Sequence, residues 1–561
     1  MAIALALAMV AISCAPVAAP SAPAPAPQAT PRAAAPAPPS TPAPPAPPSA
    51  SPTPAAAKAE TPRYGGTLRI GAIANPANFD AQQDPSINVY IAVTPIYNGI
   101  VQYDDETGSK IVPALAESWT VSGDSLTYTF KVRQGVKFHD GTPLTTDDIV
   151  YNLQRVKSPP KGIISNLGWL LAAVTKIEKV GDDSVRLTLD YPFAPLMTVL
   201  AHNSFPIYPR RVVEAKGDMK TTAIGTGPFK FKSYTPGVSF AVMRNPDYWN
   251  KGRPYVDAVT FPILSDRGTY IAALRTGQLD LSGRYFAGLS PSERDTVKQS
   301  IPAMAIYPGP TVAGPWYQFN TRQGSPLSDV RVRKAVSLAF DRQSALKVVA
   351  EGAGALGGVF IMYEDWGLSP AELTQLPGFR QPKDQDIAQA RKLMADAGYP
   401  NGFELTILSR TNKATRDASI FLAAQLQPLG IQSKVEVVED AVHTQRRIDS
   451  NFQVWAFTTA NVLPDPHWMT RYFVPGSPLH STGLKDARIT ELADKQVREP
   501  DPAKRRQLLQ EMERYFLTEV LDSLPGVNPI TFLAASPKIR GFTPGISDYE
   551  MNHLESIWLA E

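Results

Sequence analysis

The chain has 561 residues with 55 Lys and Arg, 52 Asp and Glu and one Cys, and at roughly 150 residues per domain this length predicts three or four domains. Residues 64–561 carry 52 basic and 51 acidic side chains, so the net charge of +3 gives no reason to expect a nucleic-acid partner. A single Cys excludes an internal disulfide and any zinc site built from two or more cysteines.

The N-terminus predicts a signal segment over residues 1–14. Residues 2–12 are uniformly apolar, which is too short to span a hydrocarbon core of ~30 Å but suits the apolar region of a signal peptide. The following Ala11-Ile12-Ser13-Cys14 is similar to the cleavage box of bacterial lipoproteins, in which small residues precede a lipid-modified Cys. We therefore expect Cys14 to carry a lipid anchor, as the protein's one attachment to a membrane.

A Pro/Ala-rich segment follows over residues 15–63. Residues 15–62 hold 17 Pro and 18 Ala and no aromatic residue, so they cannot bury a core that would offset the entropy of ordering. We expect a disordered tether, which as a polyproline II chain at ~3.1 Å per residue would reach ~150 Å.

The next stretch predicts short strands and one helix. Apolar residues alternate at 67–73, at 125–132 (SLTYTFKV) and at 185–189, as in half-buried strands. Between the last two, Thr145-Thr-Asp-Asp148 matches a capping box that opens a helix with Ile149, Leu153 and Val156 on one face. These elements predict a β-rich domain over residues 110–222.

Residues after 328 predict an α/β architecture. Apolar side chains recur at helical spacing from Val332 to Phe340, behind a cap at Ser328, and a second helix over 386–397 stops at Gly398. A strand at 403–408, a helix at 414–428 and a strand at 431–438 form a βαβ unit, which implies parallel pairing.

Two catalytic motifs occur outside their usual context. Gly352-Ala-Gly-Ala-Leu-Gly357 matches G-x-G-x-x-G but follows a helical pattern, so we interpret it as a flexible loop. Ser344-Ala-Leu-Lys347 matches the S-x-x-K of penicillin-recognising enzymes without its companion elements, and a secreted serine acyl-enzyme using Ser344 and Lys347 is the alternative function. The six His residues are scattered, so we expect no metal, no cofactor and no catalytic site.

Several longer stretches of the body carry a recognisable pattern. They are LAESW followed by SLTYTFKVRQGVKFHDGTPLTTDDIVYNLQRV, GTGPFKFKSY, MRNPDYWNKGRPYVDAVTF, ALRTGQLD, DVRVRKAVSLAFDR and AGYPNGFELTIL. These stretches resemble bacterial extracellular solute-binding proteins of family 5, the dipeptide-, oligopeptide- and nickel-type receptors of ABC importers. They occur in the family's order and cover nearly all of residues 64–561.

The resemblance implies an α/β, two-lobed periplasmic-binding-protein-like fold of type II with an extra β-rich domain and a ligand cleft between the lobes. Lobe I would combine 64–109, 223–303 and 530–561, with the β-rich insertion at 110–222 and lobe II at 304–529. Hinge closure would capture a peptide or peptide-like solute and present it to ABC permease subunits served by a separate ATPase. We expect a monomer tethered in the periplasm or another extracytoplasmic space.

The resemblance also implies where the ligand binds. Peptide receptors of the family capture the ligand's α-amine with an Asp in a stretch that corresponds here to residues 452–466. Alignment without gaps puts Val462 at the Asp position, and a one-residue gap puts Asn461 there, so neither alignment supplies a charge.

Other residues are candidates for the cleft because buried aromatic groups supply rigid contact area in such sites. We expect Asp465 to cap a turn. Two interpretations are open for Arg446 and Arg447, pairing with a ligand carboxylate or an exposed helix face, and we favour the exposed face. The cleft candidates are Tyr90, in the loop after the first strand, and Trp316, Tyr317, Asn320 and Trp455.

Overall fold

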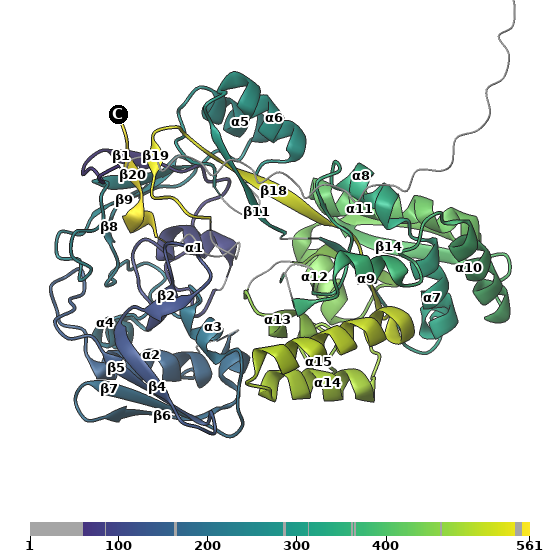
Figure 1. Cartoon of the computed structure of the whole chain (residues 1–561), viewed down its shortest axis with the longest axis horizontal. Helices are drawn as coiled ribbons and strands as arrows, with labels where there is room; N and C mark the ends of the chain where they lie inside the picture. Colours follow the sequence, from purple (N-terminus) through teal and green to yellow (C-terminus); the bar gives the residue numbers. More distant parts are fainter. Residues whose placement is uncertain are drawn as a thin grey trace, which may run out of the picture. The chain divides into compact units, whose positions relative to one another are not determined.

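Two sheets of mainly antiparallel strands are built by the N-terminal half of the chain. Their strand orders are β1-β10-β9-β8 and β4-β5-β7-β6 (Figure 1). The bounds are β1 Thr67–Arg69, β10 Ala258–Pro262, β9 Ser239–Arg244, β8 Phe229–Thr235, β4 Ala116–Val121, β5 Thr127–Val132, β7 Ser184–Leu189 and β6 Val174–Val180. Every second residue of β5 and β7 is buried, which confirms the alternation predicted for these two strands.

The computed structural model describes residues 60–84, 86–161, 165, 167–283, 288–311, 314–360, 363, 366–459, 463–544 and 553–561. Within it, Thr61–Glu561 form one compact unit. The signal segment and nearly all of the predicted tether lie outside the described residues. No helix of the described part is long and apolar enough to cross a membrane.

Helix α2 (Thr146–Lys157) packs against the sheet β4-β5-β7-β6 and begins as predicted. The Thr145 side chain accepts a hydrogen bond from the Asp148 N–H, and the Asp148 carboxylate accepts one from the Thr145 N–H at 2.9 Å. Ile149, Leu153 and Val156 are at most 1% exposed, so the predicted apolar face is the buried one.

A buried ion pair ties α2 to the chain that follows β1. The Arg155 guanidinium donates to both carboxylate oxygens of Asp80, at 3.0 and 2.6 Å, and the two side chains are 1% and 0% exposed. Asp80 also accepts the Met219 N–H at 3.0 Å. Buried charges of this kind hold elements together because separating them leaves an uncompensated charge.

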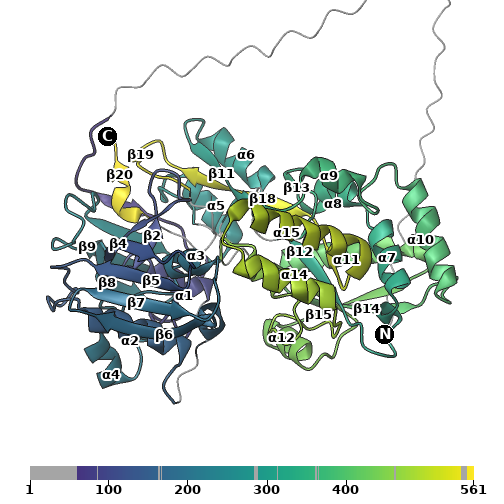
Figure 2. The same cartoon turned by 60° about the horizontal axis from the view of Figure 1, so that its bottom comes forward.

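A five-stranded sheet forms the centre of the second half, in the order β15-β14-β16-β12-β17. Its strands β12, β14 and β15 are labelled in Figure 2. Strand β14 is parallel to both β15 and β16, whereas β12 is antiparallel to β16 and β17. The predicted βαβ unit is thus confirmed as β14, α11 and β15. The bounds are β12 Pro315–Phe319, β14 Glu404–Arg410, α11 Lys413–Leu426, β15 Gln432–Val438, β16 Val454–Thr458 and β17 Ser523–Pro525.

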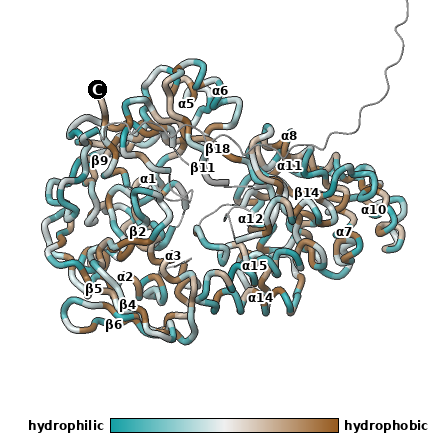
Figure 3. Tube along the Cα trace, in the orientation of Figure 1, coloured by the Kyte–Doolittle hydropathy of each residue, from teal (hydrophilic) through white to brown (hydrophobic). Residues whose placement is uncertain are grey.

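Both faces of this sheet are covered, so alternate residues of one strand enter two different cores. Tyr317 and Ala456 pack on the side of α7, α10 and α11, while Trp316 and Trp455 pack on the side of α14 and α15. The bounds of these helices are α7 Val330–Ala339, α10 Asp384–Asp396, α14 Ala487–Arg498 and α15 Pro502–Tyr515. Apolar and polar stretches alternate along them in Figure 3, as expected for helices that cover a sheet on one side.

The strands β11 (Ala305–Thr311) and β18 (Asn528–Ala535) pair antiparallel and run between the two halves, and β13 (Gly354–Ala355) pairs with β18. The prediction of a flexible loop at 352–357 is therefore wrong for Gly354 and Ala355, which form β13. These glycines permit backbones to approach closely: a Cβ on Gly357 would lie 1.3 Å from the Gly526 carbonyl oxygen.

Two further local predictions are corrected. Asp329, and not Ser328, caps α7, because its carboxylate accepts the Arg331 N–H at 2.8 Å. Tyr90 lies in helix α1 (Ile87–Val93) and not in a loop.

The remaining α-helices are α3 Leu196–Ala201, α4 Arg210–Lys216, α5 Arg267–Arg275, α6 Pro291–Ser300, α8 Arg342–Val349, α9 Pro370–Gln375, α12 Asp440–Ile448 and α13 His467–Thr470. The remaining strands are β2 Val101–Tyr103, β3 Ile111–Pro113, β19 Ile539–Arg540 and β20 Trp558–Leu559.

Replacing Arg155 by Ala should lower the free energy of unfolding by about 3–5 kcal/mol, because it leaves the Asp80 carboxylate buried without its cation. Chemical denaturation monitored by circular dichroism measures this loss. Lys392→Ala is the matched control, since Lys392 pairs with Asp396 on the surface and should contribute less than about 1 kcal/mol. A loss below about 1 kcal/mol for Arg155→Ala would contradict the role given to the buried pair.

Candidate ligand-binding site

The carboxyl ends of the parallel strands define where a site is expected. Strands β14, β15 and β16 end at Arg410, Val438 and Thr458. The antiparallel strand β12 brings Pro315 opposite Thr458, so the start of β12 lies at the same edge. In open α/β sheets, ligands bind in the crevice outside the carboxyl ends of the strands.

A stack of aromatic rings lies on one face of the sheet next to this edge. The ring centroids of Trp455 and Phe457 are 4.1 Å apart, and those of Phe457 and Tyr472 are 5.4 Å apart, with interplanar angles of 24° and 26°. Trp316 stacks on Phe516 at 6.4 Å. Trp316 is fully buried, and its indole N–H has no hydrogen-bond partner in the described part of the chain. All five rings are at most 8% exposed and belong to one apolar cluster, so they form a rigid packed layer beneath this edge.

His443 fixes the orientation of Trp455. The Trp455 indole N–H donates to His443 Nδ1 at 3.1 Å, and the other ring nitrogen, Nε2, lies 3.0 Å from the Ala456 carbonyl. Since Nδ1 accepts, the proton is on Nε2 and donates to Ala456. Burial, followed by the nearby Arg410 guanidinium, lowers the pKa of His443 to about 4, so the ring is neutral at physiological pH.

Charged side chains of both signs lie at or near this edge. The Arg410 guanidinium lies 3.8 Å from Asp440, which follows β15 together with Glu439, and the Arg447 guanidinium lies over the Trp455 ring at 5.4 Å and donates to the Pro478 carbonyl at 2.7 Å. The expectation of an exposed face for Arg446 and Arg447 is wrong, because both are half-buried and Arg446 pairs with Glu436 at 2.7 Å.

Asp465 is neutralised within the protein. Its two carboxylate oxygens accept bonds from the Arg505 guanidinium at 2.8 and 2.6 Å, and both side chains are nearly fully buried. One of these oxygens also accepts the His467 N–H at 2.8 Å, which confirms the predicted cap. Burial acts to raise the pKa of Asp465, but Arg505 holds it below its usual value.

Arg505 is not among the residues predicted for the site, although the sequence around it carries a signal. Arg505, Leu509, Met512 and Glu513 follow the spacing i, i+4, i+7 and i+8, and all four are buried on α15. A charged residue in an apolar stripe indicates a buried partner.

Glu513, from the same stripe, holds the backbone of residues 359–368. Its carboxylate accepts the N–H groups of Val359, Phe360 and Leu368, the last two at 3.2 and 2.5 Å. A Cβ on Gly358 or Gly367 would approach a Glu513 oxygen to 2.6 or 2.8 Å, so both positions favour glycine. The side chain is fully buried, and this burial raises its pKa to about 7.

Glu513 should therefore make the protein less stable as the pH rises from about 5 to 8. The native state holds a proton there up to about pH 7, whereas the unfolded chain releases it near pH 4.5, so ionising the native group costs up to about 3 kcal/mol. Glu513→Gln should remove this part of the pH dependence in denaturant titrations.

Glu511→Gln is the matched control, because Glu511 lies on the same helix with an exposed side chain paired to Arg488. If the free energy of unfolding of Glu513→Gln and of the wild type changed with pH in parallel, the raised pKa given to Glu513 would be contradicted.

The other predicted cleft residues are distributed over different parts of the structure. The Tyr90 hydroxyl pairs with Ser204, and the Tyr317 hydroxyl donates to the Ala418 carbonyl at 2.8 Å on the sheet face opposite Trp316. The Asn320 amide donates to the Phe452 carbonyl at 2.9 Å, at the end of β12 away from the ligand edge. Asn461 and Val462 lie outside the described residues. A ligand role for these residues stays a prediction.

The serine of the enzyme alternative has a structural role. The Ser344 hydroxyl donates to the carboxylate of Asp341 at 2.6 Å, and Asp341 caps α8. No cluster of three or more metal-binding side chains occurs among the described residues.

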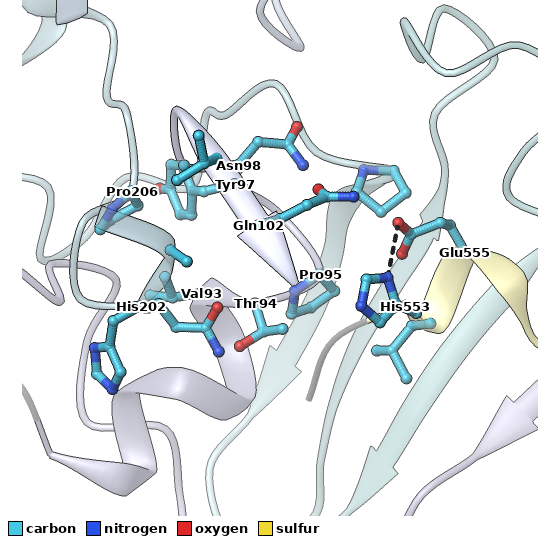
Figure 4. Close-up of a pocket in the computed structure, with 16 residues that line it drawn as sticks. Val93, Thr94, Pro95, Tyr97, Asn98, Gln102, His202, Pro206, His553 and Glu555 are labelled. Atoms are coloured by element: carbon cyan, nitrogen blue, oxygen red, sulfur yellow. Dashed lines mark ion pairs between the residues drawn. The ribbon is translucent and has the colours of Figure 1, made fainter. Parts of the chain in front are cut away.

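A small cavity lies apart from the ligand edge, between α1, β2 and residues 553–555 (Figure 4). His553 and Glu555 lie next to each other at one side of it, 3.9 Å apart. Its volume of about 50 Å³ has room for a few water molecules, since one needs roughly 10–15 Å³ on this scale. It is too small for a peptide.

Comparison with known proteins agrees with this architecture. The profile of bacterial extracellular solute-binding proteins, family 5, matches residues 110–480. A probable di/tripeptide-binding protein 5 of Pseudomonas aeruginosa is 29% identical over 515 residues, which cover 86% of this chain and 94% of that protein. The glutathione-binding protein GsiB of Escherichia coli K12 is 29% identical over 345 residues, 61% of this chain and 64% of its own length.

Solved structures show the same fold. The periplasmic binding protein DppA of Helicobacter pylori, in complex with the peptide STSA, superposes with a TM-score of 0.74 at 23% identity over 89% of this chain and 99% of its own. The binding protein AgaA of A. tumefaciens R10, in complex with agropinic acid, gives 0.73 at 26% identity over 88% and 99%.

The chain belongs to family 5 of the bacterial extracellular solute-binding proteins. The predicted two-lobed α/β fold and the role of a substrate-binding receptor are confirmed. The protein works outside the cytoplasm, as the family does. None of these findings supports the serine acyl-enzyme alternative.

Proposed function

We propose that this receptor delivers a peptide-like solute to the permease of an ABC importer, with a separate ATPase supplying the energy. The names of its relatives support this proposal, since the P. aeruginosa protein is described as di/tripeptide-binding and the E. coli protein as glutathione-binding. We assign lobe I to 64–109, 223–303 and 530–561, the insertion to 110–222 and lobe II to 304–529, with β11 and β18 as hinge strands. The receptor acts as a monomer.

The site lies at the carboxyl edge of the five-stranded sheet. Trp455, with Trp316 behind it, supplies the apolar wall on the lobe II side. We assign Asn461 and Val462, which follow β16 in the sequence, to contact with the ligand. Arg410 and Arg447 are available to pair with a carboxylate of the ligand.

The observation that carries the proposal is the engagement of Asp465 by Arg505. With that carboxylate neutralised, and with uncharged residues at 461 and 462, this stretch has no acid that would hold an ammonium group. The preferred ligand therefore needs no free amine: it is an N-blocked or cyclic peptide, an opine-like compound or a non-peptidic solute. The structural similarity to AgaA, which was solved with agropinic acid, supports this ligand class.

A receptor of this kind should bind a free-amine peptide no more tightly than its N-acetylated counterpart. Breaking a buried Asp–ammonium pair costs ~3–5 kcal/mol, or a factor of roughly 10²–10³ or more in affinity, and that pair is missing here. Calorimetric titration with matched free and acetylated di- and tripeptides measures the ratio of their dissociation constants directly.

Val462→Asp is the matched variant, and it should gain a preference for the free amine of at least tenfold. A preference above tenfold in the unmodified protein would mean that another acid captures the amine, and would overturn the ligand class proposed here.

We assign the membrane attachment to a lipid on Cys14, with the Pro/Ala-rich segment 15–63 as a tether. The apolar run before Cys14 and the small residues next to it support this assignment. A tether of that length holds the receptor away from the bilayer while leaving it within reach of a permease.

Cys14→Ser should release the protein from membranes, because the lipid supplies the hydrophobic attachment. Fractionation of cells that express the wild type and the variant, followed by a high-salt wash, tests this. A variant that still pellets with the membrane after the wash would show that a different anchor exists.

A further inference from the structure

The β-rich region 110–222 contacts the segment that carries the candidate site in lobe II. Leu463 and Val497, which belong to lobe II in sequence, are 1% and 6% exposed and are part of the same apolar cluster as the core of the β-rich region. In Figure 1, α13 and α14 lie beside the part of the chain that contains α3. The contact therefore joins two regions that are more than 240 positions apart in the sequence.

Aromatic rings from the two sides interlock at this contact. The ring centroid of Trp169 lies 5.7 Å from those of both His467 and Trp468, and Phe193 meets His467 edge to face at 5.5 Å and 89°. These are the separations at which aromatic pairs attract each other beyond simple area burial. His467 is 8% exposed, so its ring is enclosed by the contact.

Cation–π contacts and a backbone hydrogen bond reinforce the rings. The Arg498 guanidinium lies 3.8 Å from the centre of the Tyr191 ring, and that of Arg471 lies 4.9 Å from the Trp169 ring. The Ala194 N–H donates to the Val497 carbonyl at 2.9 Å. The contact thus combines apolar, aromatic and directional interactions.

The two sides of the contact are fixed to different lobes. The Asp80–Arg155 pair fixes the β-rich region to lobe I, while the Asp465–Arg505 pair fixes the start of α13 to α15 in lobe II. Strands β11 and β18 run between these lobes. A rotation about those strands that separates the lobes must therefore break the contact between the β-rich region and α13–α14.

We propose that Trp169, Tyr191 and Phe193 of the inserted domain form a docking surface for α13 and α14, and that this surface holds the receptor closed in the absence of ligand. The inference rests on the division into lobes given under the proposed function. We call these three residues, together with His467, Trp468 and Arg498, the latch.

The latch acts on affinity without touching the ligand. A solute that binds the closed form has an apparent dissociation constant equal to the intrinsic one divided by the closed fraction, so a latch that raises this fraction tightens binding. The contact that contains the latch also lies close to the candidate site in the sequence, because Leu463 of that contact directly follows Val462. Its residues are thus positioning residues for capture.

Distance measurements in the unliganded protein test the latch. The body contains no Cys, and Cys14 is the only one in the chain, so the full-length Cys14→Ser protein with Thr120→Cys and Thr444→Cys takes one spin label on the inserted domain and one on lobe II, both at exposed positions. Pulsed electron–electron double resonance then gives the populations of short and long distances between the two spin labels.

Arg498→Ala should lower the ratio of short to long distances about fivefold, and Trp169→Ala, which removes two ring contacts and a cation–π contact, tenfold or more. Arg488→Ala is the matched control, because Arg488 lies on the same helix and stacks on Tyr515 at 5.3 Å within lobe II. It should change the ratio less than twofold.

An unchanged ratio for Arg498→Ala, or a parent protein without a short-distance population, would overturn the latch. Arg498 is exposed, so its replacement leaves a folded protein even if Trp169→Ala does not fold. The experiment uses no ligand, so its failure and a failure of the proposed peptide-like ligand are distinguishable.

Discussion

The buried pair between Asp465 and Arg505 determines how the candidate site is built. Two bonds of 2.8 and 2.6 Å between nearly inaccessible groups hold the segment after β16 against α15. Such a pair adds little net stability, since desolvation of both charges opposes their attraction, but it fixes geometry because either charge alone would be costly. It also removes the one acid of residues 452–466 from ligand recognition.

The same logic applies to the inserted domain. The Asp80–Arg155 pair fixes α2 to the chain that follows β1, and the Trp169 ring contacts His467 and Trp468. In the division into lobes that we propose, the first contact ties the insertion to lobe I and the second brings it against lobe II. An insertion in one lobe can thereby influence the balance between open and closed forms of the whole receptor, because a two-state equilibrium responds to any contact that exists in one state and not in the other. The ligand and the inserted domain then act on the same equilibrium from different places.

The local structure followed the sequence closely wherever neighbours in the chain decide it. The capping box at Thr145–Asp148 and the β14–α11–β15 unit are present as predicted. The failures occurred where distant segments decide. The glycines at 352–357 suggested a loop, but they are needed because β18 and Gly526 approach their backbone. Arg447 suggested a solvated helix face, but the Trp455 ring lies under it.

The sequence by itself determined the family-like order of motifs, the α/β alternation of the second half, the single Cys at position 14 and the absence of charge at positions 461 and 462. These properties depend on residue identity and on spacing along the chain. Only the tertiary structure decided that Arg505 neutralises Asp465, that Glu513 is buried with three amide donors, and that Trp169 meets His467. Each of these contacts joins residues 40 to nearly 300 positions apart, and no periodicity or local propensity encodes which distant partner a buried charge or ring will find.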